Sequence, residues 1–463
     1  MDYNTALTCV LFTILAASYG WGMRGAVIGG EKGAMLPGAF IGLILAWFSG
    51  GAIRENFWIP AAAGLMGMTF GGTEPYGETI GMVLHRGKPD YNSVKGYTGL
   101  ALKGALWFAV CGGFLGISFA SMAGEYKAYE SALLCLLIPV ITEIGYRVFN
   151  TPYDKQKKVY PKIFFSLTRR EEWGSNVAML LALIVFAAVK GDTFSMVMMA
   201  FGFFFGAVGW LVAMKSYVLA VYPLKNGRYL FGKLYHKNLI DGWKLMEYVL
   251  GVFGGLGLSL AFCIRYNDIK AYNELIKING RFGTGDYPKC LPVIAVVCVA
   301  VIMVINVYQF ICEKNGRKLS WFIWDRIERP FYYAIPMIPV LLGSVTAAKI
   351  MTVFMLVFVC AVKCVLDRFA NSKFLILGQI ISLIFCAVTL AGCFTDIYSP
   401  FILIVAGIVP YLVAEFAYAV WENKQKGRPF VFLLKNSAFA TVYPCFVVQA
   451  IIILLVSYKI FGF

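Results

Sequence analysis

The feature that most constrains this chain is a series of continuous apolar runs, each close to twenty residues long and separated by short polar segments. A helix of about twenty residues crosses roughly 30 Å of hydrocarbon. In lipid, only helices and closed barrels satisfy their backbone hydrogen bonds, and a barrel would show segments of about ten residues with alternating polarity. The continuous runs therefore predict an all-α polytopic integral membrane protein.

Composition supports this fold class. Of the 463 residues, 60% are hydrophobic and 14% are charged, whereas soluble domains carry roughly a quarter of their residues as charged side chains. The net charge of +16 does not indicate nucleic acid, because the basic residues are scattered between apolar runs. The twelve cysteines form no Cys-x-x-Cys pair and are interpreted as small core residues. The expected partner is the lipid bilayer, and no metal or cofactor is expected.

Hydropathy places about fourteen membrane-crossing helices, with twelve to fourteen as the range. They are expected near 5–22, 34–50, 58–72, 99–123, 131–147, 174–190, 193–221, 243–265, 291–312, 331–348, 350–366, 374–394, 399–421 and 437–458. The third is short and glycine-rich. The stretch 331–366 is tight for two crossings because it contains Pro336 and Pro339.

The distribution of basic residues predicts the orientation. Cytoplasmic loops collect Lys and Arg, and alternate loops of this chain carry about 27 such residues against about 10 on the other side. This bias predicts a multi-pass protein of the plasma (inner) membrane with both termini outside.

The first eight helices are interpreted as a tandem repeat of a four-helix unit. The first helix ends in Gly20-Trp21-Gly22-Met23-Arg24 and the fifth in Gly145-Tyr146-Arg147. Further matches keep their order, which predicts units at 1–125 and 126–265 and a C-terminal six-helix block at 266–463. Transporters often place a binding site between such repeats. Chance similarity is the alternative, because glycine and aromatic residues are common in membrane proteins.

The connection after the first helix is a candidate anion site. It runs through Arg24, Gly29, Gly30, Glu31 and Lys32 into the next helix. Free backbone N–H groups at a helix start favour an anion, and glycine allows a ligand to approach the backbone. Glu172, in the matched stretch before the sixth helix, would belong to a related site. The alternative interpretation is a tight hairpin in which Arg24 pairs with Glu31.

A second candidate follows the short third helix. Glu74 and Glu78 lie four residues apart in a stretch rich in glycine that also contains Pro75. Non-helical backbone at membrane depth persists only where it is buried in protein or lines a water-filled cavity. The segment therefore predicts a broken or re-entrant helix whose carboxylates bind a cation or relay a proton. An ordinary solvated loop is the alternative.

Ionisable residues inside predicted helices complete the candidate substrate-binding set, because they are costly in lipid and usually face a cavity or a partner. They are Glu143, Arg147, Lys215 and Glu247. Structural salt bridges, Glu143 with Arg147 and Glu247 with Lys215, are the alternative. Lys103 is expected close enough to the start of its helix for its ammonium to reach the interface.

These observations favour a secondary-type transporter for a small anionic or zwitterionic solute, with coupling to H⁺ or Na⁺ left open. The expected site lies between the two N-terminal units, and no catalytic residue is assigned. The alternative is an integral-membrane transferase that acts on a lipid-linked, phosphate-containing sugar or acyl donor. An enzyme is disfavoured because neither histidine falls within a predicted helix and no Asp-rich or Cys/His metal cluster is present. A channel is a third option.

Overall fold

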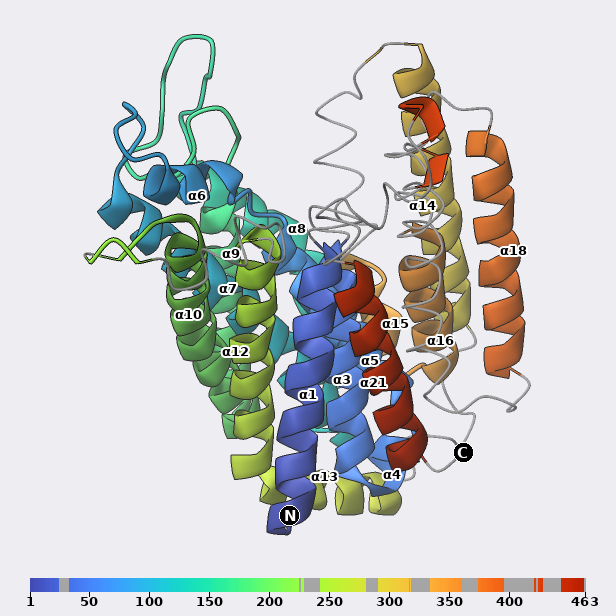
Figure 1. Cartoon of the computed structure of the whole chain (residues 1–463). Coiled ribbons are helices and arrows are strands. Elements are labelled where there is room, and N and C mark those ends of the chain that lie inside the picture. The colour runs from blue at the N-terminus through green and yellow to red at the C-terminus, as the bar shows by residue number, and fades with distance from the viewer. Residues whose placement is uncertain are drawn as a thin grey trace.

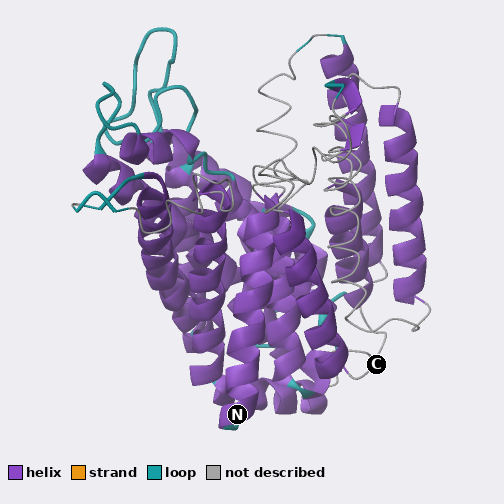
Figure 2. Cartoon of the chain, in the orientation of Figure 1, coloured by secondary structure: helices purple, strands orange, loops and turns teal. Residues whose placement is uncertain are grey.

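The computed structural model describes a set of segments that covers most of the chain. They are residues 1–24, 33–224, 226–228, 242–279, 290–315, 317, 334–359, 374–394, 420–421, 424–427 and 443–461. The described segments are mainly helical and contain no named strand, and the one isolated β-bridge joins Asp154 and Val159 (Figure 2).

Figure 1 shows how the helices are arranged. Their bounds are α1 Tyr3–Met23, α3 Met35–Ser49, α4 Gly51–Glu55, α5 Trp58–Gly72, α6 Gly77–Leu84, α7 Ser93–Ala123, α8 Ala128–Phe149, α9 Trp173–Lys190, α10 Thr193–Val221, α12 Gly242–Ile264, α13 Tyr266–Asn279, α14 Cys290–Lys314, α15 Met337–Leu341, α16 Val345–Val353, α18 Phe374–Phe394 and α21 Tyr443–Phe461, with a π-helical segment η4 at Phe354–Val359.

Seven helices of the described part are long and apolar enough to cross a membrane, namely α1, α7, α8, α9, α10, α12 and α14. The chain is therefore a helical, membrane-embedded protein. Helices α3 and α5 have 15 residues each, less than the roughly twenty needed for a perpendicular crossing. Fourteen full crossings remain a prediction, as do the two N-terminal units, and most of 399–421 lies outside the described residues.

The first of the two helices expected over 331–366 is interrupted in the described residues 334–359, and 360–366 lie outside the described residues. Helix α15 has five residues and ends before Gly343, which adopts a φ of +87°. Helix α16 has nine residues and continues into the π-helical turn η4. Pro336 caps the start of α15, Pro339 lies in the first turn where proline is tolerated, and the positive φ of Gly343 ends the helix.

Six helices form a closed circuit in which each packs against the next, in the order α1, α3, α5, α7, α10, α12 and back to α1. Helix α7 is buried along most of its length, whereas α8 packs with α9 outside the circuit and is largely exposed. Helix α13 lies across the end of the bundle where α1 begins, and α21 ends on that side too (Figure 1).

Glycines allow α7 and α10 to approach at backbone distance. A Cβ built on Gly206 would lie 2.1 Å from the carbonyl oxygen of Gly104, and one on Gly104 would lie 2.4 Å from that of Gly206. Gly112 and Gly116 make equally close approaches to Met198 and Ser195 of α10. This contact holds together the two predicted units, because α7 belongs to the first and α10 to the second.

Candidate functional site

A four-residue link between α5 and α6 carries the candidate site. Helix α5 ends at Gly72, α6 begins at Gly77, and residues 73–76 are not helical. The structure thus confirms the predicted break after the short third helix. Pro75 lacks the N–H that a continuous helix would need at that position. Instead of lying in a solvated loop, Glu74 is only 1% exposed, so the solvated interpretation is wrong for this residue.

The first polar network surrounds the fully buried ammonium of Lys103 in α7. Lys103 Nζ donates to the Pro75 carbonyl oxygen at 2.5 Å, to Thr79 Oγ1 at 3.0 Å and to Glu171 Oε1 at 2.7 Å. Glu74 Oε2 lies farther away, at 3.7 Å. We call Lys103, Glu74 and Glu171 the lysine centre. A buried charge is tolerated only when it is paired and hydrogen-bonded, and Lys103 meets both conditions.

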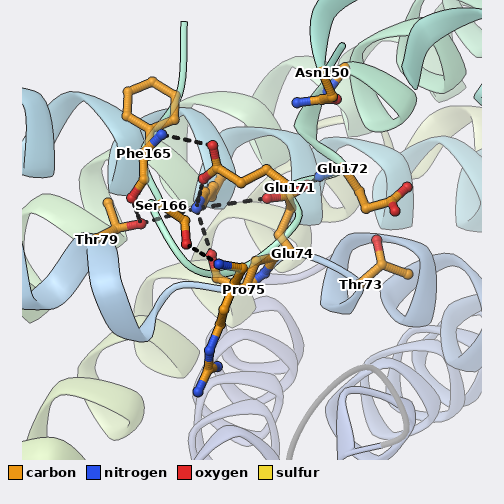
Figure 3. A network of polar contacts seen from close by, with 12 residues as sticks. Thr73, Glu74, Pro75, Thr79, Asn150, Phe165, Ser166, Glu171 and Glu172 are labelled. Carbon is orange, nitrogen blue, oxygen red and sulfur yellow. Dashed lines mark hydrogen bonds and ion pairs between the residues drawn. The ribbon is translucent and has the colours of Figure 1, made fainter. Parts of the chain in front are cut away.

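The carboxylates of this network come from two segments that face each other (Figure 3). Glu171 also accepts the backbone N–H of Phe165 at 2.7 Å. Glu74 Oε1 accepts the backbone N–H of Glu172. The side chain of Glu172 is paired with Arg170, whose Nε lies 3.3 Å from Glu172 Oε1. The segment before α9 therefore closes over the link between α5 and α6.

The pKa values of Glu74 and Glu78 are shifted in opposite directions. Burial raises the pKa of Glu74 to about 8, and Glu171 and Glu172 add to this rise while Lys103 opposes it. Burial also acts against ionisation of Glu78, but hydrogen bonds from Thr168 and from the Leu167 N–H outweigh it and lower the pKa of Glu78. The two carboxylates therefore have separate partners, and their pKa values are shifted in opposite directions.

The second polar network begins with the buried Arg24 at the end of α1. Its Nη2 donates to the Gly72 carbonyl oxygen at 3.2 Å. The guanidinium carbon lies 5.0 Å from the ring centroids of Trp21 and Tyr76 and 5.3 Å from that of Trp107. We call Arg24, Trp21, Tyr76 and Trp107 the arginine–aromatic layer. Such stacking on aromatic faces stabilises a desolvated guanidinium by about 2 kcal/mol per favourable contact.

Glu247 of α12 joins this layer through Tyr76. Its Oε1 accepts the Tyr76 hydroxyl and the Trp243 indole N–H, both at 2.9 Å. Its Oε2 pairs with Lys244 Nζ at 2.6 Å, and Lys244 also donates to the Gly22 carbonyl oxygen at 3.3 Å. Glu247 is 1% exposed. The alternative interpretation that paired Glu247 with Lys215 is wrong, since Lys244 is the ion-pair partner of Glu247 and Lys215 is exposed.

Three buried indoles line the same region. Trp21 and Trp107 stack with ring centroids 5.3 Å apart and an interplanar angle of 6°, and Trp210 meets Trp107 edge-on at 5.6 Å. Within the described residues, the Nε1 atoms of Trp21, Trp107 and Trp210 make no hydrogen bond. A buried donor without an acceptor costs about 1–3 kcal/mol. Three buried indole donors therefore lie in this region without an acceptor among the described residues.

The link joins both networks. Glu74 and the Pro75 carbonyl belong to the lysine centre, and Tyr76, the next residue, belongs to the arginine–aromatic layer. Each network draws residues from both predicted units: Lys103 and Tyr76 come from 1–125, whereas Glu171 and Glu247 come from 126–265. A displacement of one unit against the other would change both networks together.

Comparisons with known proteins do not identify a function for this site. No protein-family model, curated protein or solved structure matches the chain. In the described segments there is also no group of three or more His, Cys, Asp or Glu side chains that could hold a metal ion.

Other predicted site residues lie elsewhere. Lys215, expected to be a buried charge inside a helix, is exposed on α10. Glu143 and Arg147 form an i,i+4 ion pair at 2.6 Å on α8, with the Arg147 side chain 70% exposed, which agrees with the structural alternative. The predicted anion-site residues Gly29, Gly30, Glu31 and Lys32 lie outside the described residues.

Sequence reasoning missed some of the most buried members of the site. Lys103 was expected near a helix end, but α7 begins at Ser93 and places it ten residues inside the helix. Glu171 and the tryptophans were not chosen, although Glu171 adjoins Glu172 in the matched stretch. The signal that could have found Lys103 is its position in a helix whose polar start, 93–98, precedes the apolar run.

Proposed function

We propose that this protein is a secondary-type transporter for a small anionic or zwitterionic solute, which binds between units 1–125 and 126–265 beside Arg24. One observation carries the proposal: two buried networks of opposite charges are shared between the units and meet at the non-helical link 73–76. Ionisable groups in a membrane protein are retained at such cost chiefly where they serve a substrate or ion pathway.

The arrangement suits alternating access. In transporters built from repeats, one bundle rocks against the other around a site that irregular backbone helps to form. Here the contact between α7 and α10 lies between the proposed units, and the link 73–76 supplies the irregular backbone. Because Tyr76 and Glu247 come from opposite units, their hydrogen bond would break and re-form as the units move.

The chemistry of the site defines the solute class. Arg24 and Lys244 offer positive charge, and the indole N–H groups of Trp21, Trp107 and Trp210 offer donors for a carboxylate or phosphate. Glu247 offers a carboxylate that can accept the ammonium of a zwitterion. A solute with an anionic head and a flat or apolar body fits these aromatic surroundings best.

We also propose a plasma-membrane location with both termini outside. The start of α1 and the end of α21 lie at one end of the bundle (Figure 1). The opposite end carries the 150–172 connection with Lys155, Lys157, Lys158 and Lys162. Basic loops favour the cytoplasmic side, so the charged networks would lie toward the cytoplasm.

Uptake into proteoliposomes tests the proposal. Vesicles with purified protein are given radiolabelled phosphate, succinate, glutamate or glycine betaine in turn, and accumulation is compared with that in protein-free vesicles. We expect at least one probe to accumulate, and Arg24→Ala to reduce its initial rate about tenfold or more through the lost ion contact. Lys277→Ala, an exposed lysine on α13, is the control. Equal uptake by Arg24→Ala and wild type would contradict the proposal.

The transferase alternative keeps one observation in its favour. Arg24 caps the end of α1 and Lys244 is the third residue of α12, so both cations lie near helix ends, where the phosphate of a lipid-linked donor could reach them. Incubation with a lipid-linked pyrophosphate sugar and a hydroxyl-bearing acceptor, followed by chromatography of the lipid and the acceptor, separates the two functions. Transfer of the sugar to the acceptor oxygen with release of the pyrophosphate lipid would favour the transferase, and an unchanged donor would favour the transporter.

A further inference from the structure

We propose that Glu74 is the proton-binding group of this site and that a proton on Glu74 travels together with the anionic solute. This inference rests on the proposed transport function and assigns it a coupling ion. The step is a simple protonation, in which the Glu74 carboxylate takes one proton from water to give a neutral carboxylic acid and later returns it on the other side.

The ammonium of Lys103 lies closer to the carboxylate of Glu171 than to that of Glu74. It contacts Glu171 Oε1 at 2.7 Å, but Glu74 Oε2 lies 3.7 Å away, beyond hydrogen-bond distance. Glu171 receives a second hydrogen bond from the Phe165 N–H. Glu171 is therefore the carboxylate that neutralises Lys103, and Glu74 is left with weaker compensation for its own charge.

The two carboxylate oxygen atoms of Glu74 have different surroundings. Oε1 accepts the backbone N–H of Glu172, whereas Oε2 is buried and has no hydrogen-bond partner in the described part of the chain. A buried carboxylate oxygen without a donor is strongly disfavoured in its charged form. Protonation at Oε2 removes that charge, so the proton has a defined atom to occupy.

The charged groups around Glu74 lie on α7, on the segment before α9, on α1 and on α6. Lys103 of α7 and Glu171 and Glu172 of the segment before α9 act on it directly. Two other groups have different contacts: Arg24 of α1 is bonded to the Gly72 carbonyl, and Glu78 of α6 accepts N–H groups from residues 167 and 168. Among the described residues, the carboxylates of Glu171 and Glu172 oppose ionisation of Glu74, whereas the Lys103 ammonium and the Glu172 N–H favour it.

The charges of the two networks balance among the described side chains. These include four cations (Lys103, Arg24, Lys244 and Arg170) and four carboxylates (Glu74, Glu171, Glu172 and Glu247). With all of them ionised, 4 − 4 gives no net charge. With Glu74 protonated, 4 − 3 leaves one positive charge, and a monoanion then neutralises the site. Proton and anion therefore bind favourably together.

The link 73–76 provides the physical connection between the two ligands. Glu74 holds the proton, Pro75 accepts from Lys103, and Tyr76 contacts both Arg24 and Glu247. Protonation of Glu74 weakens its attraction to Lys103 and thereby alters the position of Tyr76, two residues away, in the arginine–aromatic layer. The expected stoichiometry is one proton per monoanion, which makes transport electroneutral.

Infrared difference spectroscopy of the solute-free protein tests the proton site independently of transport. The pH is raised from about 6 to about 10, a range that brackets the expected titration. We expect the wild type to lose one carboxylic-acid C=O band near pH 8, Glu74→Gln to lack that band change, and Glu274→Gln, an exposed glutamate of α13, to retain it. The same band loss in Glu74→Gln would overturn the proposal.

A second variant covers the case in which Glu74→Gln does not fold. Glu171→Gln frees Lys103 to pair with Glu74, so the band should titrate about one pH unit lower or more. With the pH range extended down to about 4, complete disappearance of the band in Glu171→Gln would make Glu171 the proton carrier and overturn the assignment.

Proteoliposomes loaded with the pH dye pyranine test the coupling. Uptake of the probe anion found above should acidify wild-type vesicles, whereas Glu74→Gln should exchange the anion without acidification. Anion uptake by the wild type without acidification would overturn the coupling and leave the transporter intact. If no anion is taken up at all, the transport function fails, and the infrared titration alone decides whether Glu74 holds a proton.

Discussion

Tyr76 donates its hydroxyl to Glu247 Oε1 at 2.9 Å, across 171 positions of sequence. This bond ties the link between α5 and α6 to the first turns of α12. It also sets Tyr76 between a buried carboxylate and the guanidinium of Arg24. The proposed site depends on this relationship, because it joins Tyr76 of the link 73–76 to a carboxylate from the other proposed unit.

Removing that hydroxyl should therefore weaken the site. Tyr76→Phe keeps the ring against Arg24 but leaves Glu247 with only Lys244 and Trp243. We expect a loss of about 1.5–3 kcal/mol in unfolding free energy, the range for hydrogen bonds to charged groups. Thermal unfolding in detergent measures it, with Tyr129→Phe, at a residue 64% exposed on α8, as the control. Equal losses in both variants would show that the Glu247 bond contributes nothing.

Lys103 and Glu171 should behave as a coupled pair. Lys103→Met leaves a buried carboxylate without its cation and should destabilise the protein by about 3–5 kcal/mol. Adding Glu171→Gln to it should restore part of that loss, because the uncompensated charge is removed. Melting temperatures of the two single variants and the double variant measure the coupling. Additive effects would argue against a buried ion pair.

The stability of the protein should depend on pH through Glu74. Its pKa is raised from 4.5 to about 8, so the folded protein holds a proton that the unfolded chain releases between these values. The stability that this group provides is complete below pH 4.5 and is lost as the pH rises to about 8. The melting temperature of wild type should fall relative to that of Glu74→Gln across this window. A constant difference between the two would contradict the raised pKa.

We expect that the glycines at the close contact of α7 and α10 cannot be replaced by residues with a side chain. Gly206→Ala places a methyl group 2.1 Å from the Gly104 carbonyl oxygen, and the helices must separate at a cost of about 1–3 kcal/mol. Gly77→Ala is the matched control, because its nearest contact lies 3.9 Å away. The yield of folded protein in detergent, measured by size-exclusion chromatography, should fall only in Gly206→Ala.

Much of the architecture could be predicted from the sequence, because bilayer thickness and backbone hydrogen bonding dictate long apolar helices. The break after Gly72 was also predictable, since two glycines and Pro75 disfavour helix continuation. Four of the candidate residues, Arg24, Glu74, Glu172 and Glu247, are buried, and their role in substrate binding stays a prediction.

The partners of these residues could not be predicted. Lys103 contacts Glu171 across 68 positions, and such pairs depend on how helices pack. Burial of Lys215 was predicted from its place inside an apolar run, but an apolar run does not tell which side of a helix faces the core. Lys215 is exposed, so the burial of a residue inside an apolar run depends on the side of the helix on which it lies more than on its position along the helix.

The pH dependence of solute binding tests the central claim most directly, since it joins Glu74 to the arginine–aromatic layer. Isothermal titration gives the Kd of the transported anion for wild type and Glu74→Gln at several pH values. In wild type the Kd should be constant below about pH 8 and rise up to about tenfold per pH unit above it. In Glu74→Gln the Kd should not change with pH. An equal pH dependence in the two proteins would contradict the account.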